Sequence, residues 1–144
     1  MHSPFKQSVL ALRLLMVLFT VGLLFSCKQD IETELDGKWL LREVVTVDGS
    51  VQKVDTVWYN FQNTLFMYQL YDAASDSHSH FYGFKNKGDE KHFQLEMKPY
   101  VYTVDDFLQQ SDWENGTRAF TVDKKTHNSL ILHSEGKEYR FDKY

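Results

Sequence analysis

Asp36-Gly37-Lys38-Trp39-Leu40-Leu41-Arg42-Glu43-Val44-Val45-Thr46-Val47 is the stretch that decides the fold. A glycine two residues before a tryptophan opens a run rich in branched apolar residues, and Asp48-Gly49 closes that run with a turn signal. We therefore predict that this segment forms the first strand of an antiparallel all-β domain.

The rest of the chain repeats short strand patterns between turn residues. Period-two alternation is clearest where Phe93, Leu95 and Met97 share one face. Thr103 has the position of an N-cap for a short helix over 103–112, between the fifth and sixth predicted strands. The predicted strands span residues 36–47, 56–62, 65–71, 78–85, 91–97, 117–123, 130–133 and 137–142.

Eight strands linked by hairpins leave two open edges unless the first strand pairs with the last. We therefore predict that residues 36–144 form an eight-stranded antiparallel up-and-down barrel with one short helix. A two-sheet sandwich of the same strands is the alternative. The aromatic residues expected to point inward and to line a ligand site are Tyr59, Phe61, Phe66, Tyr68, Tyr82, Phe84, Phe93 and Phe120.

Residues 1–26 are predicted to be a signal peptide. Lys6 and Arg13 precede an apolar stretch over 14–25, which would be about 18 Å long as a helix. The hydrocarbon core of a bilayer is about 30 Å thick, so a retained transmembrane helix is the less favoured alternative.

Cys27 is the single cysteine of the chain, so an internal disulfide is excluded. Its position at the end of the apolar stretch resembles a bacterial lipobox, in which the thiol becomes lipidated; a conventional signal peptide that happens to end there is the alternative. Residues 27–35 would then form a lipidated cysteine and an acidic tether. Several acyl chains suffice for stable attachment to a membrane.

Acidic residues soon after such a cysteine resemble the export tags of some Gram-negative bacteria. This resemblance implies a lipoprotein anchored in the outer membrane, on its periplasmic or cell-surface side. Without Lys6 and Arg13, the mature chain keeps 14 of the 16 basic residues against 20 acidic ones, a net charge of −6. That charge disfavours nucleic acid and anionic headgroups as partners.

Gly37-Lys38-Trp39, at the head of the first of eight strands, resembles the Gly-x-Trp signature of the lipocalin and fatty-acid-binding superfamily. The resemblance extends over residues 36–142. It implies that Trp39 packs across the closed floor of the barrel, beneath a basic residue of the last strand. Arg140 is the candidate for that residue, provided that the strand ends or bulges there, because strict alternation places it opposite its neighbours Tyr139 and Phe141.

Members of this superfamily bind small apolar molecules inside the barrel, so the resemblance implies a small apolar or aromatic ligand. Nineteen Phe, Tyr and Trp residues lie outside the predicted signal peptide, and each can bury about 150–250 Å². A filled barrel is therefore as compatible with the sequence as a hollow one. A filled barrel would act as a structural or interaction module with a protein partner in the cell envelope.

His78 and His80 lie two residues apart in a predicted strand, a spacing that could place both imidazoles on one zinc ion. Asp76 or His92 could complete the shell, but spacing alone places no third ligand. We therefore predict no metal site and no cofactor.

Ser129, His133, Ser134 and Asp142 contain the residue types of a catalytic triad, but no motif marks a nucleophile. We predict no catalytic residues and no enzymatic activity. Trp58 lies on the polar face of its predicted strand, and Trp113 lies in the loop before the sixth strand. Either these rings are exposed for a sugar or protein partner, or the 103–112 helix covers Trp58.

Overall fold

The computed structural model describes residues 35–89 and 91–144. The predicted signal peptide, the predicted lipidation at Cys27 and the predicted tether up to residue 34 lie outside the described residues.

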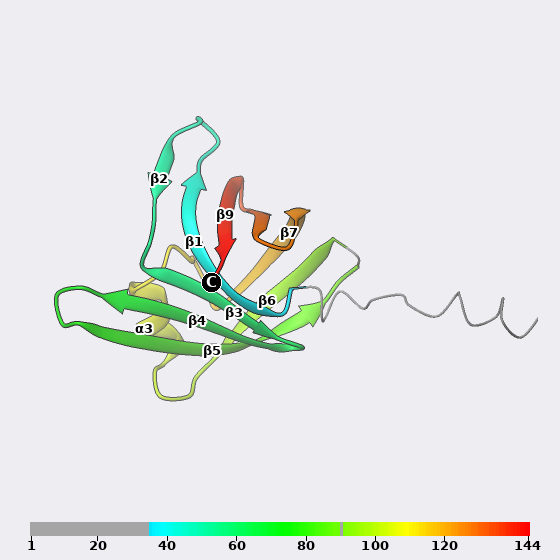
Figure 1. Ribbon diagram of the computed structural model, residues 1–144. Helices are drawn as coiled ribbons and strands as arrows, with labels where there is room; N and C mark the ends of the chain where they lie inside the picture. The colour runs from blue at the N-terminus through cyan, green and yellow to red at the C-terminus, as the bar shows by residue number, and fades with distance from the viewer. Residues whose placement is uncertain (1–34, 90) are drawn as a thin grey trace, which may run out of the picture.

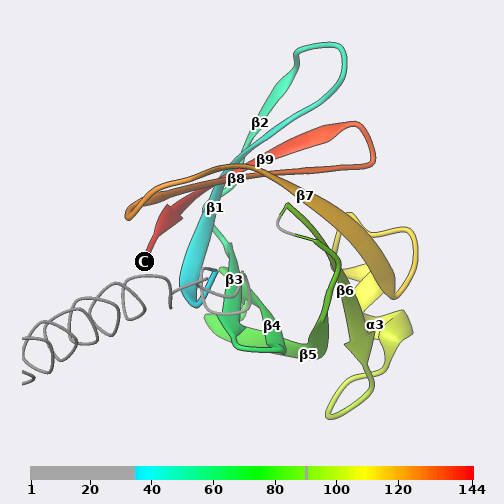
Figure 2. The same cartoon turned by 90° about the vertical axis from the view of Figure 1, so that its right-hand side faces the viewer.

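The described chain forms a closed antiparallel β-barrel (Figures 1 and 2). Each strand pairs with its neighbours in the order β2-β1-β3-β4-β5-β6-β7-β8-β9, and an additional pairing of β1 with β9 closes the ring. The predicted barrel of eight long strands is confirmed, and the sandwich is excluded. The elements are β1 (Gly37–Val45), β2 (Val51–Lys53), β3 (Val57–Gln62), β4 (Leu65–Asp72), β5 (Ser77–Lys87), β6 (His92–Lys98), α3 (Val104–Gln109), β7 (Thr117–Lys125), β8 (Ser129–Ser134) and β9 (Lys137–Lys143).

The short strand β2 was not predicted. Its three residues pair with the end of β1, where Glu43 faces Lys53 and Val45 faces Val51. All three β2 residues are exposed, so their sequence carries no alternation between a buried and an exposed face. Backbone pairing alone makes this segment a strand.

Aromatic rings fill the centre of the barrel. The ring of Tyr59 lies against those of Phe66, Tyr68 and Phe141, with centroids 5.2, 5.5 and 4.9 Å apart. Contacts of this kind add about 0.5–1.5 kcal/mol each beyond the area that they bury. The residues predicted to point inward that are buried in this core are Tyr59, Phe61, Phe66, Tyr68, Phe93 and Phe120.

The predicted inward orientation of Tyr82 and Phe84 is wrong. Both side chains face outward and are 41% and 42% exposed, whereas Phe81 is buried. Aromatic residues occupy both phases of this strand, so period two cannot choose its inner face. The pairing register decides: Phe81 lies opposite the buried Tyr68, and Tyr82 lies opposite Met67 on the outer face.

The predicted helix forms, but it is shorter than the 103–112 segment. Thr103 caps it, because its hydroxyl accepts a hydrogen bond from the Asp106 backbone N–H at 3.1 Å and the Asp106 carboxylate accepts one from the Thr103 backbone at 2.8 Å. Phe107 on this helix packs against Tyr68 and Phe81, with ring centroids 5.1 and 5.3 Å apart. Helix α3 therefore covers part of the aromatic core. Within the described residues, no helix has the length and apolar character needed to span a bilayer.

Candidate functional site

The floor of the barrel is built around Trp39. Its indole is buried, and Nε1 donates a hydrogen bond to the Leu35 carbonyl at 2.8 Å. Above the ring lies Lys143, whose Nζ is 4.2 Å from the ring centroid and donates to the Asp36 carbonyl at 2.7 Å. The first strand and the end of the last strand are thus joined at this tryptophan.

Gly37 makes room for that lysine. Its backbone has φ +124°, a conformation that residues with a side chain rarely adopt. A Cβ atom at this position would lie 2.1 Å from Lys143 Nζ. The glycine and the tryptophan of the motif therefore work together: one leaves the space for the cation, and the other supplies the ring beneath it.

Arg140 does not cover Trp39. Its guanidinium lies on the outer face of β9, 3.1 Å from the Glu43 carboxylate and 2.5 Å from that of Glu138. The alternation of β9 is unbroken, so Arg140 points to the face opposite that of Tyr139 and Phe141. Of the two basic residues that share the phase of these rings, Lys137 and Lys143, it is Lys143 that lies at Trp39. Burial, followed by the charge of Lys125, lowers the pKa of Lys143.

A buried arginine, which the sequence analysis did not single out, lies inside the barrel. The Arg118 guanidinium contacts the carboxylates of Asp112 and Glu135 at 3.1 and 2.9 Å and donates to the Ser134 hydroxyl at 3.0 Å. It also donates to the Tyr139 hydroxyl. Arg118 has the same phase as the inward Phe120, two residues later, and this alternation could have identified it.

Asp112 joins this network from the loop after α3. Its carboxylate accepts a hydrogen bond from the Tyr139 hydroxyl at 2.6 Å. Burial by itself would raise the pKa of Asp112, but the Tyr139 hydrogen bond and the Arg118 charge outweigh it and lower that pKa. Burial, then the bond to Asp112, raises the pKa of Tyr139. The network fixes the 110–116 loop to the barrel wall.

Trp113, in the same loop, fills the barrel from this side. The side chain is buried, its Nε1 donates to the Tyr59 hydroxyl at 3.2 Å, and its ring stacks on Phe66 at an interplanar angle of 15°. The interpretation of Trp113 as an exposed ring is therefore wrong. Trp113 therefore occupies interior space that would be empty in a hollow barrel.

Trp58 is buried on the outer face, and α3 is not what covers it. The rings of Tyr144 and His78 lie 5.9 Å from its ring, and Lys38 Nζ lies 5.1 Å from its centroid. Its Nε1 is buried without a hydrogen-bond partner among the described residues. The cover comes from the chain terminus and from neighbouring strands.

The histidine pair remains without a third ligand. The His78 and His80 rings lie 6.3 Å apart, and His78 also contacts the ring of Tyr71 at 5.0 Å. Over residues 35–89 and 91–144, no three metal-ligating side chains come together.

The residues of the hypothetical triad do not meet. His133 lies on the outer face near Glu138, at 3.4 Å, whereas its neighbour Ser134 points inward to Arg118 and donates to the Ala119 carbonyl at 2.7 Å. Asp142 pairs with Arg42 at 3.1 Å. Adjacent residues of a strand point to opposite faces, so Ser134 and His133 cannot act together.

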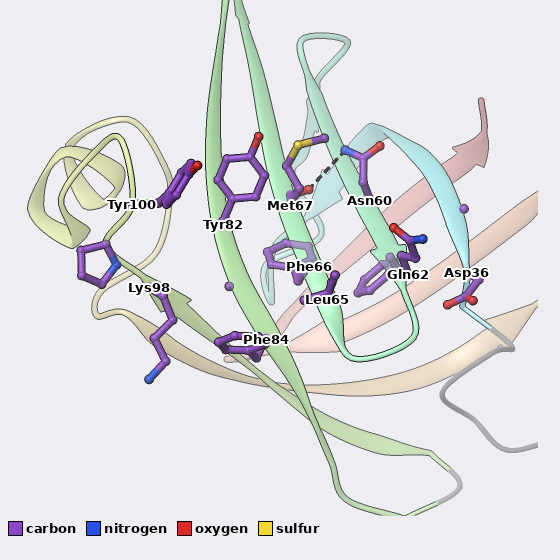
Figure 3. A pocket seen from close by; sticks show the side chains of 14 residues that line it. Asp36, Asn60, Gln62, Leu65, Phe66, Met67, Tyr82, Phe84, Lys98 and Tyr100 are labelled. Carbon is purple, nitrogen blue, oxygen red and sulfur yellow. Dashed lines mark hydrogen bonds between the residues drawn. The ribbon is translucent and has the colours of Figure 1, made fainter.

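A groove of about 800 Å³ opens on the outer face of β3, β4, β5 and β6 (Figure 3). Tyr82 lies between Met67 and Tyr100, and its ring centroid is 5.5 Å from that of Tyr100. Four of the eight ligand-lining candidates border this groove: Phe61, Phe66, Tyr82 and Phe84.

The groove combines apolar surface with a few polar groups. Leu65 and Phe84 lie opposite each other in the β4–β5 pairing and form an apolar patch at one end. The amides of Asn60 and Gln62 line the side nearer β1. An open apolar surface with sparse polar groups is suited to a small apolar or aromatic molecule.

These features define a small lipocalin-type β-barrel, a fold that supports ligand binding. The chain belongs to the lipocalin-like domain family, which matches residues 21–144. It is similar to the crystal structure of a lipocalin-like protein from Bacteroides uniformis ATCC 8492, with 28% identity over 77% of this chain and 99% of that one and a TM-score of 0.69. An uncharacterized protein from Bacteroides eggerthii DSM 20697 is 30% identical over 76% of this chain and 98% of its own, with a TM-score of 0.62. Among curated proteins, none matches.

Proposed function

We propose that this protein is a lipid-anchored, lipocalin-like binding protein of the outer membrane that holds a small apolar or aromatic ligand in its outer groove. The observation that supports this site is the volume of about 800 Å³ on the outer face of the barrel. The interior is the less suitable place, because aromatic rings meet there on Tyr59. The ligand site thus lies on the wall of the barrel and not within it.

The rings of Tyr82, Phe84 and Tyr100 supply the apolar contacts of this site. A flat aromatic ligand would stack on them, and a chain-like ligand would lie along them. The amides of Asn60 and Gln62 would orient one polar group of the ligand. The rest of the binding energy comes from the apolar surface that the ligand covers.

Fluorescence of N-phenyl-1-naphthylamine tests this site, because the dye brightens in apolar surroundings. We expect the wild type to bind the dye, and Tyr82→Ser and Phe84→Ser to weaken that binding severalfold. Val47→Ser is the matched control: Val47 is also an exposed apolar residue, but it does not border the groove. Equal binding by all four proteins would refute the groove as the ligand site.

The anchor is tested by Cys27→Ala, which removes the only cysteine. We expect the variant to leave the membrane fraction and to appear in the soluble periplasmic fraction, because the acyl chains supply the attachment. A variant that still fractionates with membranes would contradict the lipid anchor. Either result leaves the dye-binding test of the groove unaffected.

The packing around Tyr59 favours a second candidate function, in which the barrel is a structural or interaction module for a protein of the cell envelope. Failure of the dye to bind the wild type would favour this function over the first. In both cases we regard the protein as a binding protein that works without catalytic residues, metal or cofactor. Its net charge after removal of the signal peptide makes nucleic acid an unsuitable partner.

A further inference from the structure

The described chain enters the domain beside the groove. Leu35 is buried beneath the floor, where its carbonyl accepts the Trp39 hydrogen bond. The next two residues, Asp36 and Gly37, border the groove (Figure 3). Any tether that precedes Leu35 therefore leaves the domain at the floor end, next to the groove.

The length of that tether limits how far the domain can stand from the membrane. Leu35 follows Cys27 by eight positions in the sequence. An extended chain spans at most about 3.3–3.6 Å per residue, so a lipidated Cys27 would lie within about 26–29 Å of Leu35. This distance is comparable with the thickness of the hydrocarbon core, and it keeps the floor end close to the bilayer surface.

The face beside the tether is apolar and exposed. Leu65 is 51% exposed and Tyr100 is 80% exposed, and the outward Tyr82 and Phe84 lie between them. Val101, next in the loop after β6, is 71% exposed. Tyrosine has an apolar ring and a polar hydroxyl, and it is one of the residues enriched at membrane–water interfaces.

Charge distinguishes this face from another wall of the barrel. The groove is bordered by one acidic and one basic side chain, Asp36 and Lys98. Lys98 pairs with Glu96 at the β6 edge of this face, whereas the outer face of β1 and β9 carries several exposed charges, among them the pairs Arg42 with Asp142 and Arg140 with Glu43 and Glu138. Bringing charged groups into an apolar phase costs free energy, so the groove face is the one that can approach lipid.

We propose that the groove face, defined by Leu65, Tyr82, Phe84, Tyr100 and Val101, lies on the bilayer that anchors the protein. This inference rests on the proposed lipid anchor and deepens the proposed groove function, because an apolar ligand would reach the groove from the bilayer without crossing water. The contact is made by apolar side chains and not by charge, so it does not require anionic headgroups.

Site-directed spin labelling of the lipidated protein in phosphatidylcholine vesicles tests this orientation. The thiol of Cys27 carries the lipid, so a newly introduced cysteine is the single reactive thiol. Labels at Phe84→Cys and Tyr100→Cys report the groove face. Labels at His133→Cys and Arg140→Cys, on the outer face of β8 and β9, are the controls.

We expect the ratio of oxygen accessibility to nickel-chelate accessibility to be severalfold higher at positions 84 and 100 than at positions 133 and 140. Equal ratios at the four positions, in protein that floats with the vesicles, would overturn the docking proposal and leave the anchor intact. Lipidation-dependent flotation is the independent readout: protein that does not float would overturn the anchor and the docking with it. If labels at positions 84 and 100 are inaccessible to both reagents in native membranes but accessible in vesicles, a protein partner covers this face. That result would also overturn the proposal.

Discussion

The ammonium group of Lys143 lies over the indole of Trp39, 4.2 Å from the ring centroid. The two residues stand opposite each other in the pairing of β1 with β9, the pairing that closes the barrel. The space for the lysine exists because Gly37 has no side chain. The contact that covers the barrel floor therefore lies within the strand pairing that closes the barrel, β1 with β9.

The Lys143–Trp39 contact should be measurable in a double-mutant cycle. We expect Trp39→Ala to cost about 3–5 kcal/mol as a large-to-small core change. Lys143→Met should be coupled to it by about 0.5–2 kcal/mol, the range of cation–π contacts. Urea unfolding of the four proteins measures both quantities. Arg140→Met is the control and should show no coupling to Trp39, since Arg140 lies on the outer face.

Gly37→Ala should destabilise the barrel for two separable reasons. The new Cβ would collide with Lys143 Nζ, and alanine would be strained at φ +124°. We expect part of the loss to be recovered in the Gly37→Ala, Lys143→Ala double variant, because the collision disappears and only the backbone strain remains. Additive losses in thermal unfolding would show that the glycine does not make room for the lysine.

Arg118→Met should be among the most damaging substitutions of a charged residue in this domain. It removes the buried cation beside the Tyr139 hydroxyl and leaves Asp112 with Lys137 as its cationic contact, at 3.4 Å. Breaking a fully buried pair costs about 3–5 kcal/mol, and we expect the lower end of this range because the Asp112 side chain is 39% exposed. Chemical denaturation measures the loss, and Arg140→Met, at an exposed ion pair, should change stability little. Equal stability of the two variants would contradict a structural role for the buried network.

Asp112→Asn should flatten the acid side of the stability profile. The folded-state pKa of Asp112 is lowered, so its carboxylate contributes stability that is fully present above the unfolded value of about 3.9 and is lost as pH falls through the folded value. We expect the difference in unfolding free energy between wild type and variant to shrink over that window. Asp105→Asn, at an exposed position in α3, is the control for a general effect of lost charge. A constant difference across the window would deny the carboxylate this role.

Trp113→Ala should open a cavity in the aromatic core. The loss of a buried tryptophan costs about 3–5 kcal/mol, and an apolar cavity of this kind can take up a small apolar molecule. We therefore expect lower stability in urea, with partial recovery when benzene is added. No recovery with benzene would indicate that the core collapses around the missing ring.

The strands could be predicted from the sequence because the alternation of apolar and polar residues follows which side chains are buried. Phe93, Leu95 and Met97 are buried as predicted, and the glycine and tryptophan at the head of β1 are enough to indicate the lipocalin-like family. The same alternation places two further residues: Arg118 shares the phase of Phe120, and Lys143 shares the phase of Phe141. Both residues are basic: Arg118 is buried against Asp112 and Tyr139, and Lys143 lies over Trp39 at the exposed floor end.

The sequence by itself determined the succession of the eight longer strands, the short helix with its capping threonine and the lipocalin-like class, because these depend on local periodicity and turn chemistry. Only the tertiary structure decided that Tyr82 and Phe84 face outward, that Lys143 covers Trp39 and that Trp113 fills the core. Each of these depends on the register between strands or on the path of a loop, and both are set by contacts between residues far apart in the chain. The groove also depends on strand register and on the path of a loop, since the outer faces of several strands and one loop form it together.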